Sequence, residues 1–100
     1  MPTFVLMTRL KAGELKDASA RARAGRDWLD RVNAACPEVK WRAHYSLLGP
    51  YDFMDIYEAP DMETAHKVSM ISRAAGALTA ESWEALPYER YLELMAEITQ

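Results

Sequence analysis

Residues 39–58 read VKWRAHYSLLGPYDFMDIYE, and this stretch decides how the rest of the chain folds. From Val39 to Leu48, apolar and aromatic residues alternate with more polar ones, the pattern of a strand with one dry face and one mixed face. Gly49-Pro50 is a turn signal, and strand character resumes from Tyr51 to Glu58. Two strands joined so closely are predicted to form an antiparallel hairpin.

The length of this turn sets which side chains face one another across the hairpin. Proline cannot adopt the positive φ of a type I′ turn, so two geometries remain. One is a two-residue II′-like loop, and the other is a longer loop in which Pro50 opens a type I turn. The two-residue loop pairs position 44 with 55, 46 with 53 and 42 with 57, whereas a longer loop breaks this pairing.

Before the hairpin, the sequence predicts a strand and then a helix. Thr3 to Leu10 (TFVLMTRL) is short, β-branched and apolar, which is typical of a strand buried on at least one face. Helical periodicity begins near Glu14, and Pro37 ends it because the residue before proline avoids the α region. The predicted buried stripe of this helix is Leu15, Ala18, Ala22, Gly25, Leu29, Val32 and Cys36.

After the hairpin, a second helix, a fourth strand and a short terminal helix are expected. Asp61 is placed to cap the second helix and Gly76 to stop it. Residues 78–86 favour a strand, although alanine and glutamate weaken the pattern. Beyond Pro87, apolar residues at helical spacing predict an amphipathic helix: Tyr88, Tyr91, Leu92, Met95 and Ile98.

This order predicts an α+β, ferredoxin-like βαββαβ domain that occupies residues 1–100 as one unit. Right-handed crossovers then give a four-stranded antiparallel sheet with both helices on one face. The other face is left uncovered, and the side chains assigned to it are too apolar to remain exposed to solvent: Leu48, Tyr51, Phe53, Tyr57 and Trp83. We therefore expect a homodimer or higher homo-oligomer of the dimeric α+β barrel type.

The hairpin and the chain start resemble the bacterial GYD-domain family. The resemblance rests on the run Leu48-Gly49-Pro50-Tyr51-Asp52, on Glu58-Ala59-Pro60-Asp61, and on the opening from Met1 to Leu10. The family is named for Gly-Tyr-Asp, and here Pro50 separates the glycine from the tyrosine. The resemblance implies a ferredoxin-like fold and a dimeric α+β barrel, but no reaction. Similar hairpins in ligand-sensing domains of Lrp/AsnC-type regulators favour small-molecule binding by analogy.

Charge and motifs exclude several function classes. A net charge of −3 argues against nucleic-acid binding, which needs a cationic excess. No apolar run reaches the length of a membrane span and no signal-peptide pattern is present, so we expect no membrane partner and a cytoplasmic location. The single cysteine excludes an internal disulfide. Nucleotide-loop, metalloprotease and nucleophile-elbow motifs are missing, so no cofactor and no metal are expected.

The most informative candidate is a pair, His44 and Asp55. If the turn has two residues, they are directly opposed, with Cβ atoms about 4.5–5.5 Å apart. A carboxylate that orients an imidazole is the arrangement of a general base, although an ordinary half-exposed cross-strand pair looks the same in sequence. We expect this mixed face to meet the partner sheet. The drier set is then expected under the helices: Trp41, Ala43, Tyr45, Leu47, Met54 and Ile56.

The remaining candidates are polar and aromatic groups near the same hairpin. Asp52 suits either a turn carboxylate that bonds backbone amides or a ligand group. Arg9 suits either a carboxylate clamp or a salt bridge within the sheet. The full set of predicted ligand-binding residues is Arg9, Arg42, Tyr51, Asp52, Phe53, Tyr57 and Trp83.

Three functions fit these residues. The leading hypothesis is a small-molecule-binding homodimer that encloses a mostly apolar cavity. The second is a cofactor-independent enzyme, an oxygenase or an isomerase of tautomerase type, with His44 as base and Asp55 beside it. The third is a purely structural self-association module.

Overall fold

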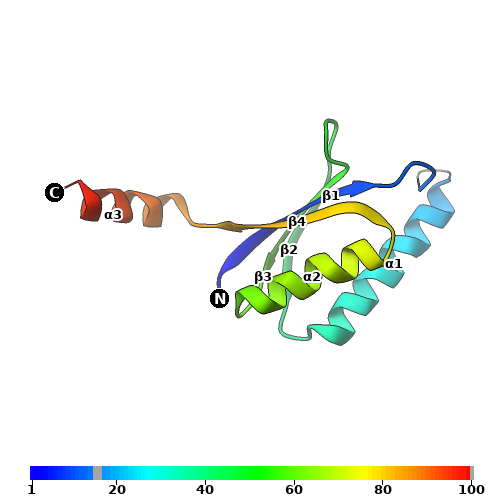
Figure 1. The fold of residues 1–100 in the computed structure, drawn as a ribbon, viewed down its shortest axis with the longest axis horizontal. Helices are drawn as coiled ribbons and strands as arrows, with labels where there is room; N and C mark the ends of the chain where they lie inside the picture. Colours follow the sequence, from blue (N-terminus) through cyan, green and yellow to red (C-terminus); the bar gives the residue numbers. More distant parts are fainter. Residues whose placement is uncertain (15–16, 100) are drawn as a thin grey trace.

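A computed structural model describes residues 1–14 and 17–99. The predicted βαββαβ order is confirmed, with a further helix at the C-terminal end (Figure 1). Strand β1 has the bounds that the sequence predicted, and the other elements differ from prediction by a few residues at their ends. The elements are β1 (Thr3–Leu10), α1 (Ala18–Ala35), β2 (Lys40–Ser46), β3 (Phe53–Glu58), α2 (Met62–Ala74), β4 (Ala77–Ala85) and α3 (Tyr88–Ile98).

The four strands form one antiparallel sheet in the order β2-β3-β1-β4. Helices α1 and α2 lie against the same face of this sheet, and α2 covers the side formed by β1 and β4 (Figure 1). The core lies between these two layers. Its largest fully buried side chains are Leu6, Val32, Tyr57 and Val68.

The helix ends are where local sequence signals placed them, with one shift. Asp61 accepts a hydrogen bond from the Thr64 backbone N–H at 2.8 Å and so caps α2. Gly76 follows α2 with φ of 117°, a conformation that favours glycine. Helix α1 begins at Ala18, capped by Asp17, rather than near Glu14. The predicted stripe residue Leu15 lies outside the described residues.

Helix α1 contributes less to the core than its periodicity suggested. Val32 is its one fully buried residue, and Cys36 is buried just after its end. Leu29, expected in the middle of the buried stripe, is only half-buried. The stripe is made mostly of small residues, so the first half of the helix does not fill the space above the sheet.

The hairpin register is confirmed at two of three predicted pairs. His44 opposes Asp55 and Ser46 opposes Phe53. The loop is nevertheless longer than two residues, because the Leu47 backbone N–H bonds the Asp52 carbonyl and leaves four residues between them. A four-residue loop preserves the same register, so the expectation that a longer loop breaks the pairing is wrong. The third pair is wrong, because an irregularity between Trp41 and Ala43 places Trp41 opposite Tyr57. Arg42 is the extra residue at this β-bulge.

The two faces of the sheet are the reverse of the prediction. Leu6 is fully buried under the helices and opposes Asp55, so Asp55 and its neighbours His44 and Phe53 face the helices. The expectation that His44 faces a partner sheet is therefore wrong. Phe53 and Tyr57, which were assigned to the uncovered face, also lie on the helix side. The residues expected under the helices lie instead on the uncovered face, with the exception of Trp41. Alternation alone did not predict this, because both faces of the hairpin are apolar enough to be buried.

The uncovered face remains rich in apolar side chains. Val5 on β1 opposes both Ile56 on β3 and Trp83 on β4, and Tyr45 on β2 opposes Met54. Tyr45 and Trp83 are 54% and 45% exposed. In the part of the chain that the structure describes, no element covers this face.

Helix α3 projects from the end of β4, away from the other elements (Figure 1). Among the described residues it contacts no other helix or strand. The arm makes the chain elongated, with a longest dimension of 55 Å against 30 and 18 Å. No helix in residues 1–14 and 17–99 is long and apolar enough to cross a membrane.

Candidate functional site

A cavity of about 560 Å³ lies between α1 and the helix-facing side of the sheet. It exists because the first half of α1 presents small residues to the sheet, including Ala22 and Gly25. The C-terminal end of α2 closes one side through Ser72. Most of its wall is apolar, and the larger apolar contributors are Leu10, Trp28, Leu29 and Phe53. A mostly apolar hollow with a few polar groups is typical of a small-molecule site.

The polar floor of the cavity is the predicted pair. His44 Nδ1 lies 2.6 Å from Asp55 Oδ1. Asp55 is 7% exposed, and this burial raises the pKa of its carboxyl group, while the hydrogen bond from His44 opposes the shift. Since Nδ1 is engaged by the carboxylate, Nε2 is the ring nitrogen left for another group.

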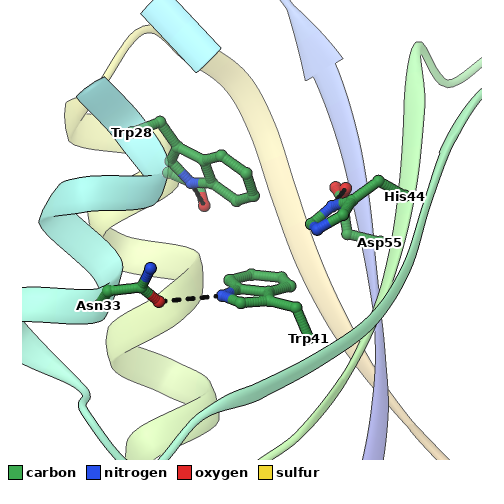
Figure 2. A network of polar contacts seen from close by, with 6 residues as sticks. Trp28, Asn33, Trp41, His44 and Asp55 are labelled. Atoms are coloured by element: carbon green, nitrogen blue, oxygen red, sulfur yellow. Dashed lines mark hydrogen bonds and ion pairs between the residues drawn. The ribbon is translucent and has the colours of Figure 1, made fainter. Parts of the chain in front are cut away.

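Two tryptophans hold the histidine in place (Figure 2). The Trp41 ring centroid lies 5.2 Å from that of His44, and the Trp28 centroid lies 6.5 Å away at nearly a right angle. Each indole is itself fixed by a hydrogen bond. Trp28 Nε1 donates to Ser72 Oγ at 2.8 Å, and Trp41 Nε1 donates to Asn33 Oδ1 at 3.2 Å. The imidazole therefore sits in an aromatic frame built from α1, α2 and the hairpin.

A basic group lies over one wall of the cavity. The Arg21 guanidinium is 5.6 Å from the centre of the Phe53 ring, a cation–π distance. The nearest acidic atom to Arg21 is Glu14 Oε2 at 3.9 Å, a long contact for an ion pair. Arg21 thus offers a positive charge beside the apolar wall, at the opposite end of α1 from Val32.

The sequence did not identify Trp28, Arg21 or Ser72 as site residues. Trp28 precedes the predicted stripe residue Leu29, and no local pattern links it to a hairpin 13 or more residues away. Their common role follows from the packing of α1 and α2 over β2 and β3, which is a long-range property.

Of the predicted ligand-binding residues, only Phe53 joins His44 and Asp55 in the cavity. Tyr57 lies on the same face but in the core, where its hydroxyl shares a 2.6 Å hydrogen bond with Ser82 and desolvation raises its pKa to about 12. The Trp41 ring centroid lies 5.3 Å from that of Tyr57, with the two ring planes tilted by 47°, so Trp41 contacts both Tyr57 and His44.

A second group of predicted residues gathers on the uncovered face. Tyr51 Oη and Trp83 Nε1 donate to the two carboxylate oxygens of Glu81 at 3.1 and 3.0 Å. Arg9 is close enough for its charge to oppose the rise in the pKa of Tyr51 that desolvation causes. Arg42 Nε bonds Glu58 Oε2 at 2.6 Å, and this bond lowers the pKa of Glu58. The structure thus divides the predicted site between two faces.

Asp52 has a structural position in the turn. Its side chain accepts a hydrogen bond from the Leu10 backbone N–H at 2.7 Å. Its own backbone N–H donates to Thr8 at 2.8 Å, and its carbonyl accepts from Leu47 at 2.9 Å. These bonds tie the hairpin loop to the end of β1.

In residues 1–14 and 17–99, no group of three histidine, cysteine, aspartate or glutamate side chains is arranged to hold a metal ion. The polar groups of the cavity are the imidazole of His44, the buried carboxyl group of Asp55, the hydroxyl groups of Thr8 and Ser72, and the charged side chains of Glu14, Arg21 and Arg26. Such a set can orient a hydrogen-bonding group of an organic ligand and can accept a proton at His44 Nε2.

Comparison with known proteins places the chain in context. The GYD domain family profile matches residues 4–95. A relative from Thermus thermophilus is described as a glutamine synthetase and cystathionine beta-lyase binding protein. It is 28% identical over 90 residues, which cover 87% of this chain and 90% of that protein.

Two solved structures share the fold. TTHA0845 from Thermus thermophilus superposes with a TM-score of 0.57 at 21% identity, over 87% of this chain and 95% of that one. At3g17210 from Arabidopsis thaliana gives a TM-score of 0.52 at 9% identity, also over 87% and 95%. At such low identity these likenesses show the fold alone.

Proposed function

The chain belongs to the GYD-domain family, and from this premise we propose that it is a binding domain whose small-molecule ligand occupies the cavity between α1 and the sheet. One observation carries the proposal: a mostly apolar cavity of about 560 Å³ has a hydrogen-bonded His44–Asp55 pair in its wall. Asp55 is buried, whereas the His44 side chain is 46% exposed, so the imidazole is held by the carboxyl group and remains accessible to a molecule in the cavity.

The lining defines the class of ligand. Trp28 and Phe53 provide aromatic walls suited to a planar apolar body. His44 Nε2 provides one hydrogen bond, and Arg21 favours an anionic or electron-rich substituent near Phe53. We therefore expect a small aromatic molecule that carries a hydroxyl or amine and an acidic group.

Anilinonaphthalene sulfonate has these features and is a suitable fluorescent probe. Gly25 lines the cavity, and the nearest atom to a Cβ added there is an Arg21 guanidinium nitrogen at 4.0 Å. Gly25→Leu should fill the cavity and lower probe affinity about tenfold or more, since each 1.4 kcal/mol is a factor of ten. The same change should not destabilise α1, because glycine is the weaker helix former by about 1 kcal/mol.

Asp30→Leu is the matched control, because it adds the same side chain to the exposed side of α1. Its probe affinity should equal that of the wild type. Equal affinity of Gly25→Leu and the wild type would place the probe elsewhere and overturn the proposal. Near-UV circular dichroism of each variant establishes that the fold is retained.

We propose further that the uncovered sheet face mediates homodimerisation. Support comes from its exposed aromatic side chains, Tyr45 and Trp83, which stand beside partly buried Val5, Met54 and Ile56. Pairing two such faces removes a contiguous apolar surface from water.

A second candidate function is general-base catalysis without a cofactor. The 2.6 Å contact to Asp55 fixes the His44 ring and leaves Nε2 to take a proton from an acidic C–H or O–H of a bound molecule. Phenylpyruvate is a suitable test compound, since its enolisation exchanges protons with solvent. Deuterium uptake that His44→Gln abolishes would support this role, and an unchanged uptake rate would exclude it for this compound.

A third candidate is an enzyme-binding role, in line with the description of the Thermus relative. It requires an exposed surface rather than the cavity. Co-elution of this protein with purified glutamine synthetase in size-exclusion chromatography would support it. Co-elution unaffected by Gly25→Leu would separate that surface from the small-molecule site.

A further inference from the structure

Helix α3 is an amphipathic helix without a partner among the described residues. Its apolar residues share one side, with exposed fractions from 37% for Met95 to 76% for Ile98. At 11 residues it is shorter than the length at which an isolated helix is stable in water. It therefore needs a surface on which to bury its apolar side: Tyr88, Tyr91, Leu92, Met95 and Ile98.

The segment before α3 directs it away from its own body. Pro87 has φ of −56° and ψ of 143°, an extended conformation, and a residue before proline is also biased to extended geometry. The arm consequently continues from the end of β4 rather than turning back (Figure 1). A surface on the same chain is accessible to α3 only if this linker reverses its direction.

A groove of suitable shape lies between α2 and the edge strand β4. Its volume is about 410 Å³, and α2 contributes Met62 and Met70, which are 65% and 62% exposed. Phe4, Ala65 and Ala80 form its apolar base. These methionines face outward on α2, on a side different from the buried Val68.

The groove and α3 match in length. The α2 residues that line the groove run from Met62 to Arg73, about 18 Å at 1.5 Å per residue, which is enough to hold a helix of the length of α3. Helix α3 has 11 residues and is therefore about 16 Å long. Methionine side chains adapt to the shape of an incoming apolar surface, which suits them to this contact.

The charges are complementary as well. Helix α3 carries Glu89, Glu93 and Glu97 against a single Arg90, and Arg90 is already bonded to Glu93 at 2.7 Å. The groove has Arg73 and His66 on its α2 side and Glu84 on its β4 side. An acidic helix is thus attracted to the α2 side of the groove.

We propose that α3 of one copy of this chain lies in the α2–β4 groove of a second copy. The proposal is independent of the ligand cavity and of the uncovered sheet face. It gives the chain two distinct surfaces for self-association, one on each side of the sheet. The exchange buries the apolar side of the arm and the exposed methionines of α2 together.

Cross-linking of engineered cysteines tests the contact. In a Cys36→Ala background, Met70→Cys and Leu92→Cys proteins are mixed and treated with a short bismaleimide. A docked pair has an effective concentration in the millimolar range, so the yield of linked dimer should be about tenfold above that of a random encounter. Leu48→Cys, fully exposed at the hairpin tip, replaces Met70→Cys as the control for random encounter.

The double variant Met70→Cys/Leu92→Cys identifies whose groove is filled. Docking on a second copy yields species of dimer mass or larger after denaturation. Linked product of monomer mass means that α3 folds back on its own groove, which overturns the proposal. A mixed yield equal to the Leu48→Cys control also overturns it. Circular dichroism of each variant checks that the fold is retained.

Discussion

Trp41 and His44 lie on the same face of the sheet although they are three positions apart along β2, and their ring centroids lie 5.2 Å apart. In a regular strand such residues point to opposite faces. The bulge at Arg42 removes this alternation for one step, so that Trp41 opposes Tyr57 while His44 opposes Asp55. The aromatic frame of the cavity therefore depends on one irregular residue in an edge strand.

The burial of Asp55 predicts that the stability of the protein depends on pH. Desolvation raises the pKa of Asp55 in the folded protein above its ordinary value of 3.8. The contribution of protonated Asp55 to the free energy of unfolding is therefore complete below pH 3.8. It is lost as pH rises through the pKa of the folded protein, because the buried carboxyl group must then ionise. Urea unfolding across this range should show the wild type losing stability relative to Asp55→Asn as pH rises. A relative gain by the wild type would mean that the bond to His44 outweighs burial.

The loose packing of α1 predicts unequal costs for two leucines. Leu6 is fully buried, so Leu6→Ala should lower the free energy of unfolding by about 2–5 kcal/mol. Leu29 lines an existing cavity and is only half-buried, so Leu29→Ala should cost about half as much or less. Chemical denaturation measures both. Equal losses would indicate that α1 lies closer to the sheet than described.

The uncovered face predicts an association defect. Tyr45 is 54% exposed on this face, and Tyr45→Glu places a charge in the proposed dimer contact. Light scattering of the wild type should give a dimer or larger species, and the variant should shift to a smaller mass than the wild type. Leu48→Glu, at the hairpin tip, should leave the mass unchanged. A folded wild-type monomer at micromolar concentration would remove the dimer proposal.

The buried hydroxyl of Tyr57 predicts a late step in an alkaline titration. Its pKa is raised to about 12, so the stability it confers is complete below the ordinary value of 10 and is lost as pH rises toward 12. Ultraviolet titration of tyrosinate should show one group ionising near the pH of unfolding, and Tyr57→Phe should lack it. Near neutral pH, Tyr57→Phe should lower the free energy of unfolding by about 1 kcal/mol. The loss is small because Ser82, which bonds Tyr57 in the wild type, keeps its hydrogen bond with Ser69.

Local chemistry in the sequence determined the elements and much of their order. Pro37 ended the first helical pattern, Asp61 capped α2 and Gly76 stopped it, because each effect acts within a few residues. The pairing of His44 with Asp55 was one of two alternatives that the sequence left open, and a loop with an even number of residues realises it.

Only the tertiary structure decided which face of the hairpin meets the helices. Alternation separates two sets of side chains but does not say which set is inside when both are apolar, as with Phe53 and Met54. The bulge at Arg42 moved Trp41 from one set to the other, and the packing of α1 brought Trp28 to the histidine. These outcomes depend on contacts between residues far apart in the chain. The sequence therefore indicated His44 and Asp55 as a candidate pair, whereas their register and the cavity that surrounds them arose from how the strands and layers assemble.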